Sequence, residues 1–156
     1  MTNLYFSDDT ISVNDLYFVC YMIECVARKL RQKNKYVVNT IGKENLYHIL
    51  SCAETLHCEN PEKIANNWIE DYKLETGTFN ITAVNPYYVD KVPSALDMGA
   101  VYQRLIVSTM STNENYVDGI LRIYNDPICK KLDYYNCGAY YEPSYCITKA
   151  YQNKGF

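Results

Sequence analysis

The chain lacks the short motifs that commonly mark a catalytic or phosphate-binding site. Only six of its 156 residues are glycine, so few places exist where a backbone can cradle a phosphate group. The sequence has no glycine-rich phosphate loop, no Gly-x-Ser-x-Gly nucleophile motif and no His-Glu-x-x-His zinc motif. These absences favour a protein that is not an enzyme and that needs no cofactor.

Long apolar segments are also missing. The longest run, Leu16 to Ile23, is far shorter than the roughly 20 residues that a membrane-spanning helix requires. The first ten residues carry no positive charge ahead of an apolar segment, which a secretory signal would need. We therefore expect a cytoplasmic protein that does not insert into a membrane.

Seven cysteines are present, but no two have the Cys-x-x-Cys spacing of a structural zinc site. An odd number cannot pair completely within one chain, and a cytoplasmic location favours free thiols. We therefore expect no metal site, and we expect most of the cysteines to be small buried apolar residues. They stand at positions 20, 25, 52, 58, 129, 137 and 146.

The net charge of −3 gives the chain no general attraction to nucleic acid. One local basic cluster, Arg28 to Lys35, contains five cations at the end of the first predicted helix. These cations can interact favourably with the helix dipole, or they can bind an anionic partner. An acidic protein surface fits such a patch better than DNA or RNA does, so weak nucleic-acid binding is kept as an alternative.

Apolar residues recur at three- and four-residue steps in most of the chain, which predicts an all-α fold with about seven helices. Start signals of the form Ser-x-x-Asp lie at Ser12 and Ser94, and caps followed by proline lie at Asn60 and Asp126. The predicted helices run from about Val13 to Lys33, then follow Thr40, Asn60, Ser94, Asn113, Asp126 and Glu142.

Residues 76–93 interrupt the helical pattern with one glycine and two prolines. We expect an irregular linker here, between a three-helix group in residues 1–75 and a four-helix group in residues 94–156. The two groups can also pack together as one compact domain.

The segment from Tyr124 to Cys146 holds three cysteines and six of the chain's 17 tyrosines. Tyrosine buries its ring while its hydroxyl stays near water, which suits helix edges and protein interfaces. Too few basic residues surround these rings for a base-stacking platform. Packing is the main interpretation, and a partner interface is the alternative. The candidate partner-binding residues are Arg28, Lys29, Arg31, Tyr134, Tyr140 and Tyr141.

A thiol-dependent enzyme is a further alternative. His48 and Cys52 are four residues apart on a predicted helix, so they lie on one face as a nucleophile and a base would. The inner face of that helix is already taken by apolar residues, and no oxyanion-stabilising group is evident. The second histidine, His57, is nine residues from His48, about 13 Å along a helix, and cannot share a metal with it.

Several phrases resemble uncharacterised small helical proteins of anaerobic Gram-positive bacteria. They are Pro93-Ser-Ala-Leu-Asp-Met-Gly-Ala-Val-Tyr-Gln-Arg-Leu-Ile106, Ile123-Tyr-Asn-Asp-Pro-Ile128 and Tyr140-Tyr-Glu-Pro-Ser-Tyr145. Residues 15–72 are similar in layout to a second helical family, with Leu56-His57 before a polar turn. Some genes of the families that this chain resembles stand beside genes for ADP-ribosyltransferase-like toxins. The resemblance implies an antitoxin-like or regulatory protein that binds a neighbouring gene product. Binding to a second copy of the chain, as a homodimer, is a variant of the protein-binding hypothesis.

Overall fold

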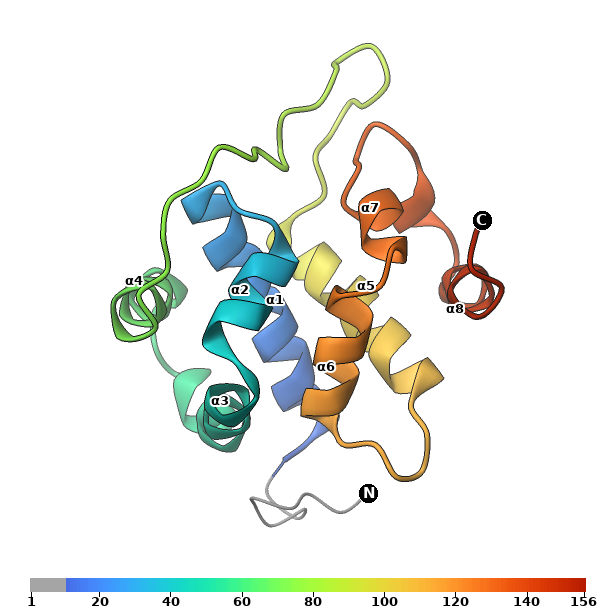
Figure 1. The fold of residues 1–156 in the computed structure, drawn as a ribbon. Coiled ribbons are helices and arrows are strands. Elements are labelled where there is room, and N and C mark those ends of the chain that lie inside the picture. Colours follow the sequence, from blue (N-terminus) through green and yellow to red (C-terminus); the bar gives the residue numbers. More distant parts are fainter. Residues whose placement is uncertain (1–10) are drawn as a thin grey trace.

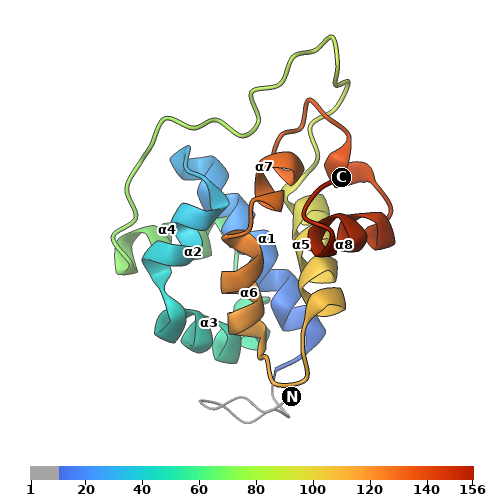
Figure 2. The ribbon, with the colours of Figure 1, turned by 45° about the vertical axis from the view of Figure 1, so that its right-hand side comes forward.

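The computed structural model describes residues 11–156 and confirms the all-α prediction, with no strand among the residues that it describes (Figures 1 and 2). Residues 11–156 form eight α-helices and one 3₁₀ helix, which is one α-helix more than the predicted number of about seven. The elements are α1 (Val13–Leu30), α2 (Asn34–Ile41), α3 (Lys43–Leu56), α4 (Pro61–Asp71), α5 (Ala95–Thr109), α6 (Tyr116–Tyr124), α7 (Ile128–Leu132), η2 (Ala139–Tyr141) and α8 (Ser144–Gln152).

Both predicted Ser-x-x-Asp start signals are capping boxes in the structure. The Ser12 side chain accepts from the amide of Asp15, whose carboxylate accepts from the amide of Ser12, and Ser94 and Asp97 do the same for α5. Helix α1 ends at Leu30, three residues before the predicted end. It stops there because Arg31 has a left-handed conformation, with φ of 55°, and its amide turns back to the carbonyl of Ala27.

Helix α2 was not predicted from the sequence. Its N-cap residue is Lys33, which offers no side-chain oxygen to the first turn, so the sequence carries no start signal here. Burial of one apolar face forms the helix instead, because Val37, Val38 and Ile41 are all buried in the core. Tertiary packing therefore replaces the missing cap.

Helix α1 lies at the centre of the molecule and contacts α2, α3, α4 and α5, with its most extensive contacts to α5 (Figure 1). The two helices approach closely because Gly99 has no side chain at their crossing. A β-carbon at Gly99 would lie 3.0 Å from both the nitrogen and the Cα of Tyr21. The buried residues of both predicted groups belong to one hydrophobic cluster, which α1 and α5 join.

Residues 76–93 contain no helix or strand and run along one end of the molecule (Figures 1 and 2). Backbone bonds hold their start against the end of α1, with Gly77 N to Leu30 O at 2.8 Å and Phe79 N to Arg31 O at 2.9 Å. Further along, the amide of Asn85 donates to Asn136 Oδ1 at 2.7 Å. The segment is therefore irregular but attached at both of these places.

Helix α7 is shorter than the sequence pattern predicts, whereas α8 reaches the predicted residues. Helix α7 ends at Leu132, so Tyr135 lies outside it, although Tyr135 is buried as expected. Helix α8 is held by Arg122 of α6, which donates to Tyr151 Oη at 2.9 Å and pairs with Glu114 at 2.7 Å.

Among the described residues no helix has the length and apolarity needed to span a bilayer.

Candidate functional site

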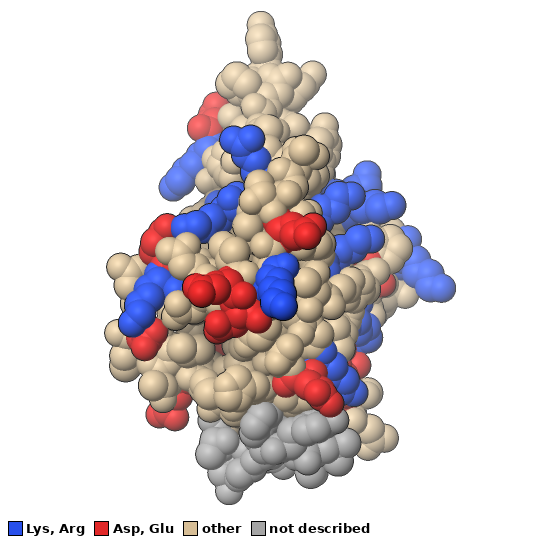
Figure 3. Space-filling model, turned by 60° about the vertical axis from the view of Figure 1, so that its left-hand side comes forward, with Lys and Arg blue, Asp and Glu red and all other residues tan. Residues whose placement is uncertain are grey.

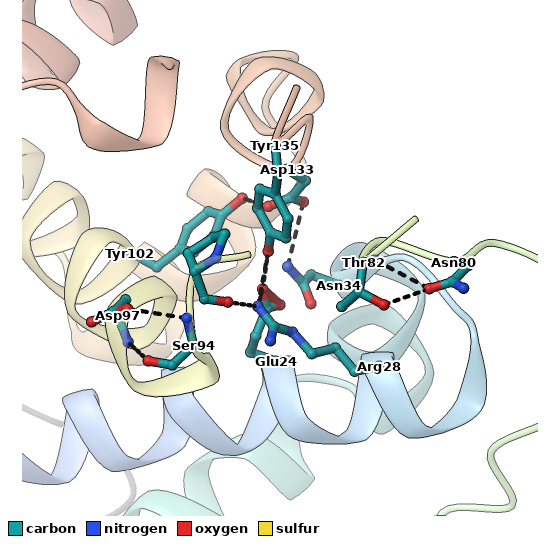
Figure 4. Close-up of polar contacts among 11 residues, drawn as sticks. Glu24, Arg28, Asn34, Asn80, Thr82, Ser94, Asp97, Tyr102, Asp133 and Tyr135 are labelled. Carbon is teal, nitrogen blue, oxygen red and sulfur yellow. Dashed lines mark hydrogen bonds and ion pairs between the residues drawn. The ribbon is translucent and has the colours of Figure 1, made fainter. Parts of the chain in front are cut away.

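A largely buried polar cluster lies where α1 meets the segment after α7 (Figure 4). Arg28 donates to the carbonyl of Pro93 at 2.8 Å, to Tyr135 Oη at 3.3 Å and to Glu24 Oε1 at 3.4 Å. The Tyr135 hydroxyl in turn donates to Glu24 Oε1 at 2.5 Å. Arg28 is therefore committed to holding α1, the start of α5 and the C-terminal segment together.

A second carboxyl group, that of Asp133, belongs to the same cluster (Figure 4). It accepts from Tyr102 Oη at 2.6 Å and from Asn34 Nδ2 at 3.3 Å. Burial, and to a smaller extent the neighbouring Glu24, raises the pKa of Asp133 well above its usual range. The neutral form of Asp133 is thereby favoured, which reduces the charge that the interior must hold.

Two of the five cations in the predicted basic cluster form ion pairs, and the other three are exposed. Arg28 is half-buried in the polar cluster, and Lys29 forms an ion pair with Glu62 of α4. Arg31, Lys33 and Lys35 are exposed. On the side of the molecule shown in Figure 3, acidic groups lie between the basic ones. Because Arg28 is half-buried and Lys29 is paired with Glu62, the five cations do not form one continuous basic surface.

The three predicted tyrosines have different environments. Tyr140 is half-buried and packs edge-on against Tyr135, with ring centroids 5.4 Å apart. Tyr134 is exposed beside the start of α2, where it lines a pocket with Lys33 and Lys35. Tyr141 is 85% exposed. Of these three, Tyr141 presents the most surface to a partner.

Sequence reasoning missed three other exposed tyrosines at this end of the molecule. Tyr87 and Tyr88, near the tip of the 76–93 segment, are 92% and 75% exposed, and Tyr145 at the start of α8 is 68% exposed. The bond between Asn85 and Asn136 holds the tip beside the C-terminal segment, and both ribbon views show the two side by side (Figures 1 and 2). We call Tyr87, Tyr88, Tyr141 and Tyr145 the tyrosine surface.

A groove of about 530 Å³ lies beside the tyrosine surface, between α5 and the segment from Tyr140 to Ile147. Its apolar floor includes Val101, Leu105 and Ile147, and the linker residue Lys91 stands at its rim. Charges of both signs line it, with Lys91 and Arg104 opposed by Asp97 and Glu142. The groove meets the tyrosine surface at Tyr141, which belongs to its lining.

All seven cysteines are free thiols. Cys20 is fully buried, and burial raises its pKa to about 12. Cys129 donates to the carbonyl of Ile123 at 3.0 Å, and burial raises its pKa as well. The thiols of Cys20 and Cys129 are therefore held in the unreactive protonated form. In the part of the chain that the structure describes, no group of three metal-binding side chains is brought together.

The candidate nucleophile and base do approach each other. Cys52 Sγ lies 3.9 Å from His48 Nε2 on consecutive turns of α3, at the surface of the molecule. Ser51 Oγ is 3.7 Å from the same sulfur, and it also donates to the carbonyl of His48. None of the pockets that border the tyrosine surface or α2 is lined by these residues.

Comparison with known proteins finds no family model, no curated protein and no solved structure that matches the chain.

Proposed function

We propose that this chain is a cytoplasmic, non-enzymatic protein-binding module that contacts its partner through the tyrosine surface. The observation that supports the proposal is the exposure of four tyrosine rings at one end of the molecule, from 68% for Tyr145 to 92% for Tyr87. Elsewhere the fold buries large tyrosines completely, as with Tyr47, Tyr102 and Tyr124. Exposure at this end is therefore not a general property of the tyrosine-rich composition.

Tyrosine suits a contact surface for physical reasons. Its ring supplies a large apolar area with few rotatable bonds, so it loses little conformational freedom when a partner covers it. Its hydroxyl can still form a hydrogen bond at the edge of the interface. Aromatic residues are correspondingly enriched at protein interfaces, and tyrosine is among the residues that contribute most to binding energy.

The segments that carry the tyrosine surface are fixed to the rest of the molecule by hydrogen bonds and ring contacts. Asn136 holds the tip of the 76–93 segment, while Tyr140 packs between Tyr135 and Tyr141, with ring centroids 5.4 and 6.4 Å away. Tyr135 is itself bonded to Glu24 of α1. A pre-positioned surface loses less entropy on binding than a flexible one.

The partner in this proposal is another protein, either a neighbouring gene product or a second copy of the chain. The resemblance to proteins encoded beside ADP-ribosyltransferase-like toxins favours an antitoxin-like or regulatory role. Binding of nucleic acid through Arg28 to Lys35 is less favoured, because Arg28 and Lys29 already have internal acidic partners, Glu24 and Glu62.

A variant with four tyrosine-to-serine changes, Y87S/Y88S/Y141S/Y145S, tests the proposal. Immobilised wild-type protein should retain a specific polypeptide from the host lysate, or light scattering should show a dimer, and the variant should lose either interaction. V13S/V107S is the matched control, because both valines are exposed but belong to the other end of α1 and α5. Equal retention by all three proteins, or a monomer that retains nothing, would contradict the proposal.

The contact between His48 and Cys52 supports a second candidate, a small thiol-dependent enzyme. A working pair would make Cys52 react with iodoacetamide at neutral pH much faster than the exposed thiol of Cys58. The His48→Gln change should then slow that reaction. Labelling of Cys52 at the rate of Cys58, unaffected by His48→Gln, would eliminate this candidate.

A further inference from the structure

A pocket of about 330 Å³ lies between the start of α2 and the segment from Tyr124 to Tyr134, and none of the four residues of the tyrosine surface lines it. We call it the lysine pocket, because Lys33, Lys35 and Lys130 line it. The first two come from the unpredicted start of α2 and the third from α7, nearly a hundred residues later. Its volume falls at the small end of the range for pockets that bind small molecules.

The three ammonium groups are not engaged in ion pairs within the described part of the chain. Lys33 instead lies over the ring of Phe79, with the nitrogen 5.6 Å from the ring centroid. Three like charges around one small pocket repel each other, and an anion placed between them would remove that repulsion.

Two carboxyl groups, those of Asp126 and Asp133, also border the pocket, and both accept hydrogen bonds from other parts of the chain. Asp126 accepts from the amide of Ile128, the first residue of α7, at 2.9 Å. It is not the N-cap that the sequence predicts, because Pro127 takes that position and no side chain caps the helix. Asp133 is bonded to Tyr102 and Asn34, and burial raises its pKa and so favours its neutral form. With Asp133 favoured in its neutral form, Asp126 is the one remaining carboxyl group beside three lysines, so positive charge is in excess around the pocket.

The start of α2 adds to the positive potential. A helix N-terminus carries a partial positive charge and exposes backbone N–H groups, so acidic or hydroxyl side chains normally occupy it. Here the N-cap is Lys33, no side chain caps the first turn, and Lys35 follows in that turn. A cation at this position is unfavourable unless an anion binds nearby.

We propose that the lysine pocket binds a small organic phosphate. A phosphate monoester carries a charge between about −1.5 and −2 at neutral pH, and lysine binds it as a compact point charge. Phe79 and Tyr134, which are both exposed at the pocket, offer aromatic faces to the organic part of such a ligand. The pocket shares no residue with the tyrosine surface, so this inference stands apart from the proposed function.

Isothermal titration of the full chain at low salt tests the inference. The probes are adenosine 5′-monophosphate, ribose 5-phosphate and adenosine. We expect at least one phosphate-bearing probe to bind, adenosine not to bind, and added salt to weaken the interaction. Tighter binding of the nucleotide than of the sugar phosphate would assign a role to the aromatic faces, and similar binding would assign recognition to the phosphate group.

Charge-matched variants show whether the binding is local. K33Q/K35Q/K130Q should weaken binding at least about tenfold, because three exposed attractions are lost together. K63Q/K73Q/K149Q, which removes three exposed lysines from other parts of the surface, should retain the affinity. Circular dichroism checks that both variants fold. No binding of either phosphate, equal binding of adenosine, or equal losses in the two triple variants would overturn the inference.

Discussion

Two carboxyl groups in the polar cluster, those of Glu24 and Asp133, share one nearby guanidinium, that of Arg28 (Figure 4). Taking a charge out of water is costly unless it is paired and hydrogen-bonded. Glu24 has both Arg28 and Tyr135 as partners, whereas Asp133 has two neutral ones, Tyr102 and Asn34. Burial raises the pKa of Asp133 well above its usual range, and among the described residues no cation is hydrogen-bonded to this carboxyl group to offset the effect.

This raised pKa makes stability depend on pH in a definite direction. The pKa of Asp133 is higher in the folded chain than in the unfolded chain, where a value of about 4 is usual. The contribution of Asp133 to the free energy of unfolding is fully favourable below the pKa that this group has in the unfolded chain. It is lost as the pH rises through the pKa that the group has in the folded chain. Asp133→Asn should remove that loss. The amide introduced by this change can still accept from Tyr102, and it can donate to the unpartnered Oδ1 of Asn34.

Urea unfolding from pH 4 upwards measures the effect. We expect the free energy of unfolding of Asp133→Asn, relative to wild type, to increase as the pH rises. Asp90→Asn, a change at an exposed carboxyl group in the 76–93 segment, is the control and should run parallel to wild type. A constant difference between Asp133→Asn and wild type at every pH would contradict the role given to burial.

The sequence predicts the positions of single residues well when the determinant is local. Burial of Tyr135 and both Ser-x-x-Asp caps follow from spacing of three to four residues. The environment of Arg28 cannot be predicted from local spacing, because its partners Pro93 and Tyr135 are 65 and 107 residues away in the chain. Nothing in the local pattern separates a half-buried arginine from the exposed cations that follow it.

At the scale of elements, seven helices were predictable because each has a cap, a proline or a clear apolar stripe. Helix α2 has only eight residues and its N-cap residue is a lysine, so neither helix propensity nor a capping residue marks it in the sequence. The end of α7 was predicted too far along, because Tyr135 fits a helical spacing from Leu132 yet reaches the core from a turn. Short helices of this kind depend on tertiary contacts, which a local pattern does not contain.

The crossing of α1 and α5 depends on Gly99, because an added methyl group would meet the backbone of Tyr21 and not a flexible side chain. Gly99→Ala should therefore lower the free energy of unfolding by about 1–3 kcal/mol, even though alanine is the better helix former. Chemical denaturation measures the change.

Gly138 offers the matched substitution. A β-carbon there meets no atom within 4 Å, and its φ of −85° is accessible to alanine. Gly138→Ala should leave stability nearly unchanged. If Gly99→Ala were as stable as Gly138→Ala, the close approach of α1 and α5 would not be a constraint on the fold.

At the scale of the whole molecule, the two helical groups share one hydrophobic cluster through α1 and α5. A single core predicts a single cooperative unfolding transition. Residues 94–156, expressed without α1, would expose the apolar face of α5 that α1 now covers. We expect this fragment to show little helix by circular dichroism, and to gain helix when residues 1–93 are added. A stably folded fragment would show instead that the two groups are separate domains.

The tyrosine surface combines residues from two segments that are far apart in the chain, so it exists only in the folded molecule. Tyr141 and Tyr145 lie in the segment that composition singles out, but Tyr87 and Tyr88 come from the irregular linker. A hydrogen bond across 51 residues, from Asn85 to Asn136, places them at the same end of the molecule. Irregular segments carry no periodic signal, so this part of the surface could not be predicted from the sequence.

The claim that this end of the molecule is a protein contact can be tested by photo-crosslinking in the native host. A benzophenone amino acid replaces either Tyr87, on the tyrosine surface, or Val13, which is exposed at the other end of α1. Irradiation at position 87 should join the chain covalently to one specific polypeptide, and irradiation at position 13 should not. A lack of any crosslink at position 87, or the same products from both positions, would contradict the claim.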